Sequence, residues 1–216
     1  MAIGKLTFFT ITASTAMIAV KSVLLSAVLA ATMVAAAQTK SPQPPSQAKP
    51  PAYLELFGVQ LKSATREQLR EVFEAGGLQP VRVEDKYWVD TYSAAGVLDG
   101  ASGFIAGYVG RTGTFAFAQY EFEGFMDTGL VTQVATMVTH KYGRASTRSG
   151  NEGLGPVTYT WKFPQGMTVS VSRGWPDTTT YLTFTDPVAH AEMRAEQEAD
   201  KRAAERERAK AQTRAF

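Results

Sequence analysis

The stretch TYTWKFPQGMTVSVSRGWPDTTTYLTFT, residues 158–185, alternates apolar and hydroxyl-bearing side chains. A period of two with one apolar and one polar face is typical of an antiparallel sheet that packs on one side only. We therefore predict strands at Thr158–Phe163, Met167–Arg173 and Thr180–Thr185. Before them, apolar residues recur at helical spacing, which predicts a helix at Asp127–Tyr142 that ends at Gly143.

A looser version of the same order occupies the preceding residues. Thr65 and Gln68 have the spacing of a capping box that begins a helix, and Gly76 ends it. A strand is predicted before this helix and three after it: Tyr53–Leu61, Lys86–Tyr92, Gly103–Val109 and Thr114–Phe122. The order predicts an α+β fold, in which residues 53–186 form two tandem helix-plus-three-stranded antiparallel sheet units, about 53–125 and 126–186.

Residues 187–216 are rich in Ala, Glu and Arg, which predicts a charged C-terminal helix. The only continuous apolar line on this helix consists of alanines, at 191, 195, 199 and 203. Because alanine buries little area, we expect a protruding helix that is not part of the core. The alanine line would also let a partner helix approach, which would make the segment an interaction arm.

Residues 1–37 have the pattern of a secretory signal peptide. An apolar run, Val23–Ala37, follows Lys21 and ends in three alanines, so we expect cleavage after Ala37 and a periplasmic or secreted protein. A start at Met17 gives a leader of more usual length than a start at Met1. If the leader is uncleaved it would be the only membrane contact, but its apolar run is shorter than the ~20 residues that cross a bilayer. Residues 38–52 are a proline-rich linker.

Composition excludes several kinds of site. The chain has no cysteine, which rules out disulfides, thiolate metal ligands and a cysteine nucleophile. The 22 Lys and Arg residues are balanced by 20 Asp and Glu, without the basic clusters that nucleic-acid binding needs. The two histidines, His140 and His190, have no carboxylate at metal-ligand spacing beside them. We therefore predict no metal, no cofactor, no nucleic acid and no catalytic residue.

The segment Arg173–Thr180 is the main candidate binding site. Trp175 is a flat apolar anchor, Arg173 a hook for an anion, Asp177 part of the turn, and Thr179 an adaptable hydrogen-bond donor. The alternative is a wide turn whose tryptophan folds back over the sheet edge. Three residues near turns of the first unit are further candidates: Tyr92, Tyr108 and Arg111.

The Tyr142-Gly143 junction, the strand with Trp161 and the threonine-rich run Thr180–Asp186 together resemble a recurring type of exported Gram-negative protein. The doubled unit is also similar in topology to β-lactamase-inhibitory proteins and to small outer-membrane-assembly factors, although the lipid-bearing cysteine of the assembly lipoproteins is missing. The resemblance implies protein binding and transfers no functional residue.

The sequence thus predicts an exported, non-catalytic envelope protein that binds another macromolecule. We expect this partner to be a second protein of the envelope. The alternative is a small periplasmic hydrolase or small-ligand-binding protein that uses a cleft between the two halves. A cleft with converging His, Asp and Arg side chains would favour the alternative, and a flat surface would favour the binding protein.

Overall fold

The computed structural model describes residues 51–213, so the predicted signal peptide and nearly all of the linker lie outside the described residues. The described chain begins with a short hairpin of β1 (Glu55–Leu56) and β2 (Val59–Gln60), where one strand at Tyr53–Leu61 was expected. The chain turns at Phe57 and Gly58, which both have positive φ angles, 51° and 78°. Within residues 51–213, no helix combines the length and the hydropathy needed to cross a membrane.

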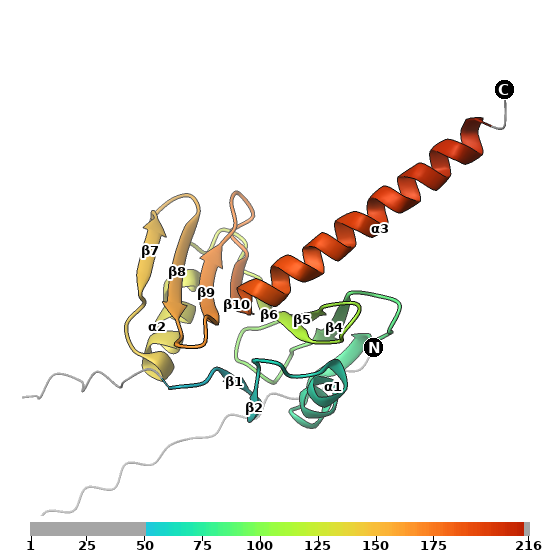
Figure 1. The fold of residues 1–216 in the computed structure, drawn as a ribbon. Coiled ribbons are helices and arrows are strands. Elements are labelled where there is room, and N and C mark those ends of the chain that lie inside the picture. The colour runs from blue at the N-terminus through green and yellow to red at the C-terminus, as the bar shows by residue number, and fades with distance from the viewer. Residues whose placement is uncertain (1–50, 214–216) are drawn as a thin grey trace, which may run out of the picture. The chain divides into compact units, whose positions relative to one another are not determined.

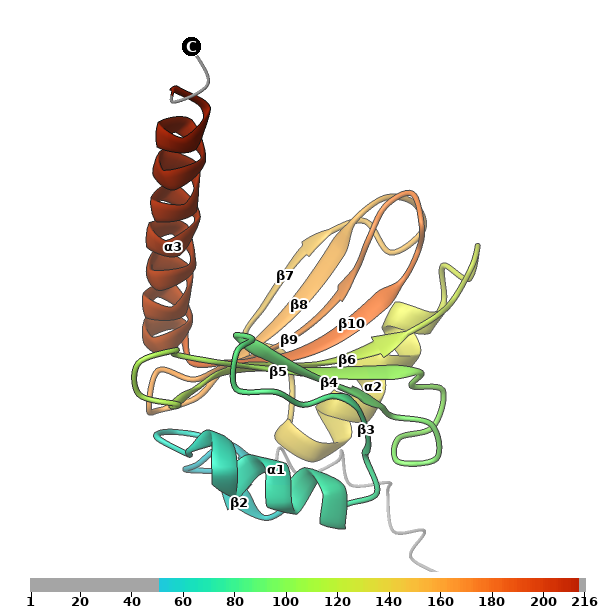
Figure 2. The same cartoon turned by 90° about the vertical axis from the view of Figure 1, so that its right-hand side faces the viewer.

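Eight antiparallel strands form one sheet in the order β3-β4-β5-β6-β10-β9-β8-β7 (Figure 1; β3 is labelled in Figure 2). A helix followed by four strands occurs twice, and the two halves meet where β6 pairs with β10. The first half contains α1 (Arg66–Ala75), β3 (Gln79–Arg82), β4 (Val89–Ser93), β5 (Gly103–Tyr108) and β6 (Phe115–Phe122). The second contains α2 (Leu130–Tyr142), β7 (Thr147–Gly150), β8 (Val157–Lys162), β9 (Thr168–Arg173) and β10 (Thr180–Thr185). The α+β class and the antiparallel sheet are confirmed.

Each half has one strand more than expected. The additional strands, β3 and β7, are the two edges of the sheet, and all their residues are exposed. An edge strand with two exposed faces shows no apolar alternation, which is the signal that predicts the inner strands.

Helices α1 and α2 cover one face of the sheet, as Figure 2 shows. The capping box of α1 is confirmed: Gln68 N–H donates to Thr65 Oγ1, and Thr65 N–H donates to Gln68 Oε1. The α1 residue Phe73 packs edge-on against Phe104 of β5, with ring centroids 4.9 Å apart. Helix α2 begins at Leu130 and not at Asp127, because Asp127 Oδ1 accepts from Gly129 N–H and Leu130 N–H and so caps the helix from outside.

Gly143 ends α2 with a φ of 80°, a conformation that suits glycine. Its carbonyl accepts a hydrogen bond of 2.8 Å from the indole N–H of Trp161 on β8. This bond joins the glycine and the tryptophan that carried the resemblance described above, and it fixes the end of α2 to the sheet.

The opposite face of the sheet is polar in the second half. Thr160, Ser170 and Thr183 lie side by side across β8, β9 and β10, and all three are partly exposed. The predicted alternation of apolar inward and hydroxyl-bearing outward residues is therefore confirmed for these strands.

The first turns of α3 (Pro187–Thr213) cover this face at the start of β6 (Figure 2). Ala189 and Met193 of α3 are buried against Val109 and Ala116. The expectation that the whole helix stands outside the core is therefore wrong for its first turns. The alanines at 191, 195, 199 and 203 are exposed, so the docked face is a different one from the predicted alanine line. From Glu198 to Thr213 every residue is exposed, as expected for a protruding helix.

One fully buried carboxylate lies beneath α1. Asp90 of β4 accepts two hydrogen bonds from Arg66, at 2.6 and 3.2 Å, and two from Arg70, at 2.8 and 3.0 Å. Burial alone would raise the pKa of Asp90, but the hydrogen bonds from Arg70 and Arg66 outweigh it and lower that pKa. The cluster fixes α1 to the sheet.

Candidate functional site

Three loops gather at one end of the second half of the sheet (Figures 1 and 2): residues 123–129, 151–156 and 174–179. They carry several large apolar side chains that are exposed. Phe125 is 88% exposed and Trp175 is 48% exposed. We call the four exposed side chains together the apolar tip: Phe125, Met126, Leu154 and Trp175.

Arg173 holds these loops together from inside. Its side chain is 2% exposed, and its guanidinium donates to the carbonyl oxygens of Thr128 at 2.6 Å, Asn151 at 2.8 Å, Glu152 at 2.9 Å and Gly155 at 2.7 Å. The expectation that Arg173 is a hook for an external anion is wrong, because all of this hydrogen-bonding capacity is directed inward. Arg173 fixes the scaffold on which the apolar tip stands.

Thr178 makes the second link between loops. Its hydroxyl accepts from Met126 N–H at 2.9 Å and donates to the carbonyl of Gly124. Asp177 Oδ1 accepts from Thr179 N–H at 3.2 Å, which closes the turn after Trp175. Thr178, which the sequence did not single out, is therefore the residue that joins the predicted loop to its neighbour.

Carboxylates share the three loops with the apolar tip. The loops carry four of them and no basic residue, although Arg148 of β7 forms an exposed ion pair with Glu152 at 3.2 Å. The four, which we call the acidic rim, are Glu123, Asp127, Glu152 and Asp177. An apolar centre with a charged rim is the general anatomy of a protein interface.

The candidates of the first half do not join this site. Tyr92 and Tyr108 are each 1% exposed, because both point inward beneath α1, so neither is accessible to a partner. Burial raises the pKa of both phenols. Arg111 is exposed, but it lies in the turn after β5 and pairs with Glu196 of α3 at 2.6 Å.

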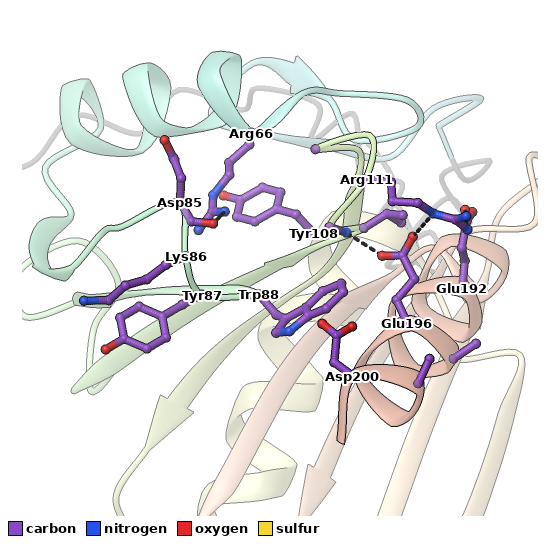
Figure 3. A pocket seen from close by; sticks show the side chains of 15 residues that line it. Arg66, Asp85, Lys86, Tyr87, Trp88, Tyr108, Arg111, Glu192, Glu196 and Asp200 are labelled. Atoms are coloured by element: carbon purple, nitrogen blue, oxygen red, sulfur yellow. Dashed lines mark hydrogen bonds and ion pairs between the residues drawn. The ribbon is translucent and has the colours of Figure 1, made fainter. Parts of the chain in front are cut away.

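A pocket of about 630 Å³ lies beside that ion pair, where α3 leaves the sheet (Figure 3). We call it the foot pocket. Its walls come from the start of α1, the segment before β4, the turn after β5 and the first turns of α3. Trp88 and Asp200 both line it, and no local pattern connects them because 112 positions separate them.

A second cavity, of about 370 Å³, lies between the halves, against β1, α2 and the middle of the sheet. Its lining is apolar apart from Lys141 and the tyrosines Tyr120 and Tyr142, and includes Phe57, Val138 and Leu182. The His, Asp and Arg side chains that would favour a hydrolase are not part of this lining. Among residues 51–213, no group of three His, Cys, Asp or Glu side chains is placed to hold a metal ion.

Comparisons with known proteins add little to this geometry. No family model matches the chain, and no curated protein matches it. A solved structure of a DUF4309 family protein (YjgB) from Bacillus subtilis aligns with 62% of this chain and 87% of its own, at 16% identity and a TM-score of 0.38. A likeness at that TM-score carries no argument about fold or function.

Proposed function

We propose that this chain is an exported, non-catalytic envelope protein that binds another protein through the apolar tip. One observation carries the proposal: exposed apolar side chains on three separate loops are held together by the buried Arg173 and Thr178. Exposed apolar residues on a soluble surface mark interaction sites when they are grouped. Loops that are already fixed lose little conformational entropy on binding.

The acidic rim indicates the chemistry of the partner. Anionic membrane surfaces attract basic segments and repel carboxylates, so the rim argues against insertion of the tip into such a surface. A second copy of the same tip would bring like charges together, which is unfavourable at an interface. The partner that fits is a protein with an apolar pocket for Trp175 and Phe125, surrounded by Lys or Arg residues.

Export and duplication belong to the same proposal. Residues 1–37 supply the leader pattern, and the resemblance to exported proteins points the same way. N-terminal sequencing of the protein recovered from the envelope or medium should begin at Gln38. Material that retains residues 23–37 would mean an anchored protein. The repeated order of one helix and four strands supports two copies of one ancestral unit.

Photo-crosslinking tests the site in the native host. A photoreactive residue at position 125 or 175 should give the same protein adduct, and one at position 81 should not give it. Val81 is the matched control because it is also exposed but lies on β3, the opposite edge of the sheet. Lipid adducts at positions 125 and 175, or binding of the purified chain to phosphatidylglycerol vesicles, would contradict a protein partner and show that the apolar tip binds a membrane.

Once the adduct is identified, Trp175→Ala should weaken its binding by about tenfold or more, as expected for a central aromatic anchor. The melting temperature should change little because half of the side chain is exposed. A loss of about 3–5 kcal/mol in the free energy of unfolding would instead show that Trp175 packs on the sheet. Replacing Glu123 and Asp177 by Gln and Asn should reduce the association rate and its salt dependence.

A further inference from the structure

We propose that the foot pocket binds a small linear polyamine. The pocket lies at the end of β6 and β10 opposite the apolar tip, since Thr185 pairs with Phe117 there while Thr180 pairs with Phe122 at the tip. The inference is therefore independent of the proposed function.

The pocket has two unlike walls (Figure 3). One is the indole of partly buried Trp88, held so close to the turn after β5 that a Cβ on Gly110 would lie 2.4 Å from the ring. The other is a line of carboxylates on α3, Glu192, Glu196 and Asp200. Residues four apart on a helix are separated by about 6 Å along its axis. A volume of about 630 Å³ lies within the usual range of ligand pockets.

The basic residues of the lining are already paired. Arg66 bonds to Asp90 at 2.6 Å, and Lys86 to Glu84 at 2.6 Å. The guanidinium of Arg111 forms a close ion pair with Glu196 at 2.6 Å and a longer one with Glu192 at 3.6 Å. Asp200 has no ion pair within the described residues. The α3 wall therefore keeps uncompensated negative charge opposite an aromatic ring.

This combination selects an organic cation. An ammonium group over an indole face gains cation–π attraction, and a nearby carboxylate adds ionic attraction. Four methylenes between two ammonium groups span about the distance between successive carboxylates of the line. Glu192 and Asp200 are eight residues apart, or about 12 Å along the helix axis, so a triamine with three- and four-methylene spacers can place one terminal ammonium between Trp88 and Asp200 and the other towards Glu192.

One wall residue of the pocket, Tyr108, lies deeper than the others. Tyr108 lines the pocket and is 1% exposed, yet its hydroxyl has no hydrogen-bond partner among the described residues. Because that oxygen is closed to solvent, it offers no contact to a ligand held between Trp88 and the carboxylates. In Figure 3 the Tyr108 ring extends beside Arg66 and Asp85, away from the carboxylate wall.

Titration of the full chain with spermidine tests the proposal, by calorimetry and by NMR of the three indole N–H resonances. Saturable binding should shift the Trp88 resonance and leave those of Trp161 and Trp175 in place. Inorganic phosphate should shift none of them. No saturable binding of spermidine, a response confined to Trp175, or binding of phosphate instead would overturn the proposal.

Variants identify the walls. Trp88→Leu should weaken spermidine binding by about tenfold, and Asp200→Asn by about threefold. Glu205→Gln is the matched control, because it removes the same charge from an exposed position of the same helix outside the pocket. Equal losses of spermidine affinity in Asp200→Asn and Glu205→Gln would show that spermidine is attracted by the charge of the helix and not by the foot pocket, which would overturn the proposal. A tri-lysine peptide that binds over tenfold more tightly than spermidine would assign the pocket to basic side chains of a partner.

Discussion

Thr178 and Met126 lie on different loops, both with a φ of 60°, and the Met126 N–H donates to the Thr178 hydroxyl at 2.9 Å. Residues other than glycine rarely adopt positive φ angles, and each costs about 1–3 kcal/mol in sparsely populated regions. Such conformations persist only where the surrounding contacts hold them. Here the shared hydrogen bond does so, and the strained loop displays Phe125 and Met126 to solvent.

The first prediction concerns this bond. Thr178→Val keeps the shape of the side chain but leaves Met126 N–H and the Gly124 carbonyl without their partner. The free energy of unfolding should fall by about 1–3 kcal/mol, as measured by urea denaturation, and crosslinking from position 125 should fall with it. Thr160→Val makes the same change on the open sheet face and should alter stability by less than about 0.5 kcal/mol. An unchanged crosslink in Thr178→Val would show that the bond does not position the tip.

The second prediction concerns Arg173. Arg173→Met leaves four backbone carbonyls of two loops without a donor in a buried site. Hydrogen bonds that involve a charged group contribute about 1.5–3 kcal/mol each, so the loss in unfolding free energy should reach at least about 3 kcal/mol. Hydrogen exchange should rise in residues 124–129 and 151–156 together. Arg148→Met is the control, because Arg148 is exposed and its ion pair with Glu152 contributes little. Faster exchange in only one of the two loops would contradict the role of a shared clamp.

The burial of Arg173 could be predicted from the sequence. It continues the inward series of Met167, Val169 and Val171, so the period that predicts the strand also predicts a buried arginine. The position of the arginine beside Trp175 predicts a binding site for an anion, whereas the alternation along the strand predicts burial. The alternation is the correct guide. The inner strands, the capping box of α1 and the glycine that ends α2 were predictable because their sequence signals are local.

Long-range placement was not predictable in the same way. The docked face of α3 depends on what the sheet presents to it, and Val109 and Ala116 are about 80 positions away from Ala189 and Met193. The edge strands β3 and β7 gave no alternation because neither face is buried. The foot pocket could not be predicted for the same reason, because one of its walls comes from α3 and the others come from the first half.

The third prediction concerns pH. Hydrogen bonds from Arg70 and Arg66 lower the pKa of Asp90 in the folded protein, whereas the unfolded carboxyl titrates near about 3.9. The folded state therefore binds this proton less readily, and the resulting stability is present above about pH 4 and is lost as the pH falls further. Asp90→Asn should lose this acid-dependent component and cost about 3–5 kcal/mol at neutral pH, because the buried Arg66 loses its counter-ion and the half-buried Arg70 keeps only Asp85. Asp85→Asn, at an exposed partner of Arg70, should retain the acid dependence. Equal acid profiles in Asp90→Asn and the unaltered chain would contradict the assignment to Asp90.

The last prediction separates the docked and protruding parts of α3. Removing the residues after Gln197 deletes only exposed positions among those described, so the melting temperature should stay within about two degrees. Removing all residues after Asp186 also exposes Val109 and Ala116 and deletes Met193, whose burial contributes about 2 kcal/mol. At about 2–4 °C per kcal/mol for a chain of this size, the melting temperature should fall by about 4–8 °C. Met193→Ala should lower it in the same direction, whereas Val188→Ala, at an exposed position of the same turns, should not. A fall of ten degrees on the shorter truncation would show that the distal helix also packs against the protein, and equal melting temperatures for both truncations would show that the first turns contribute nothing to the core.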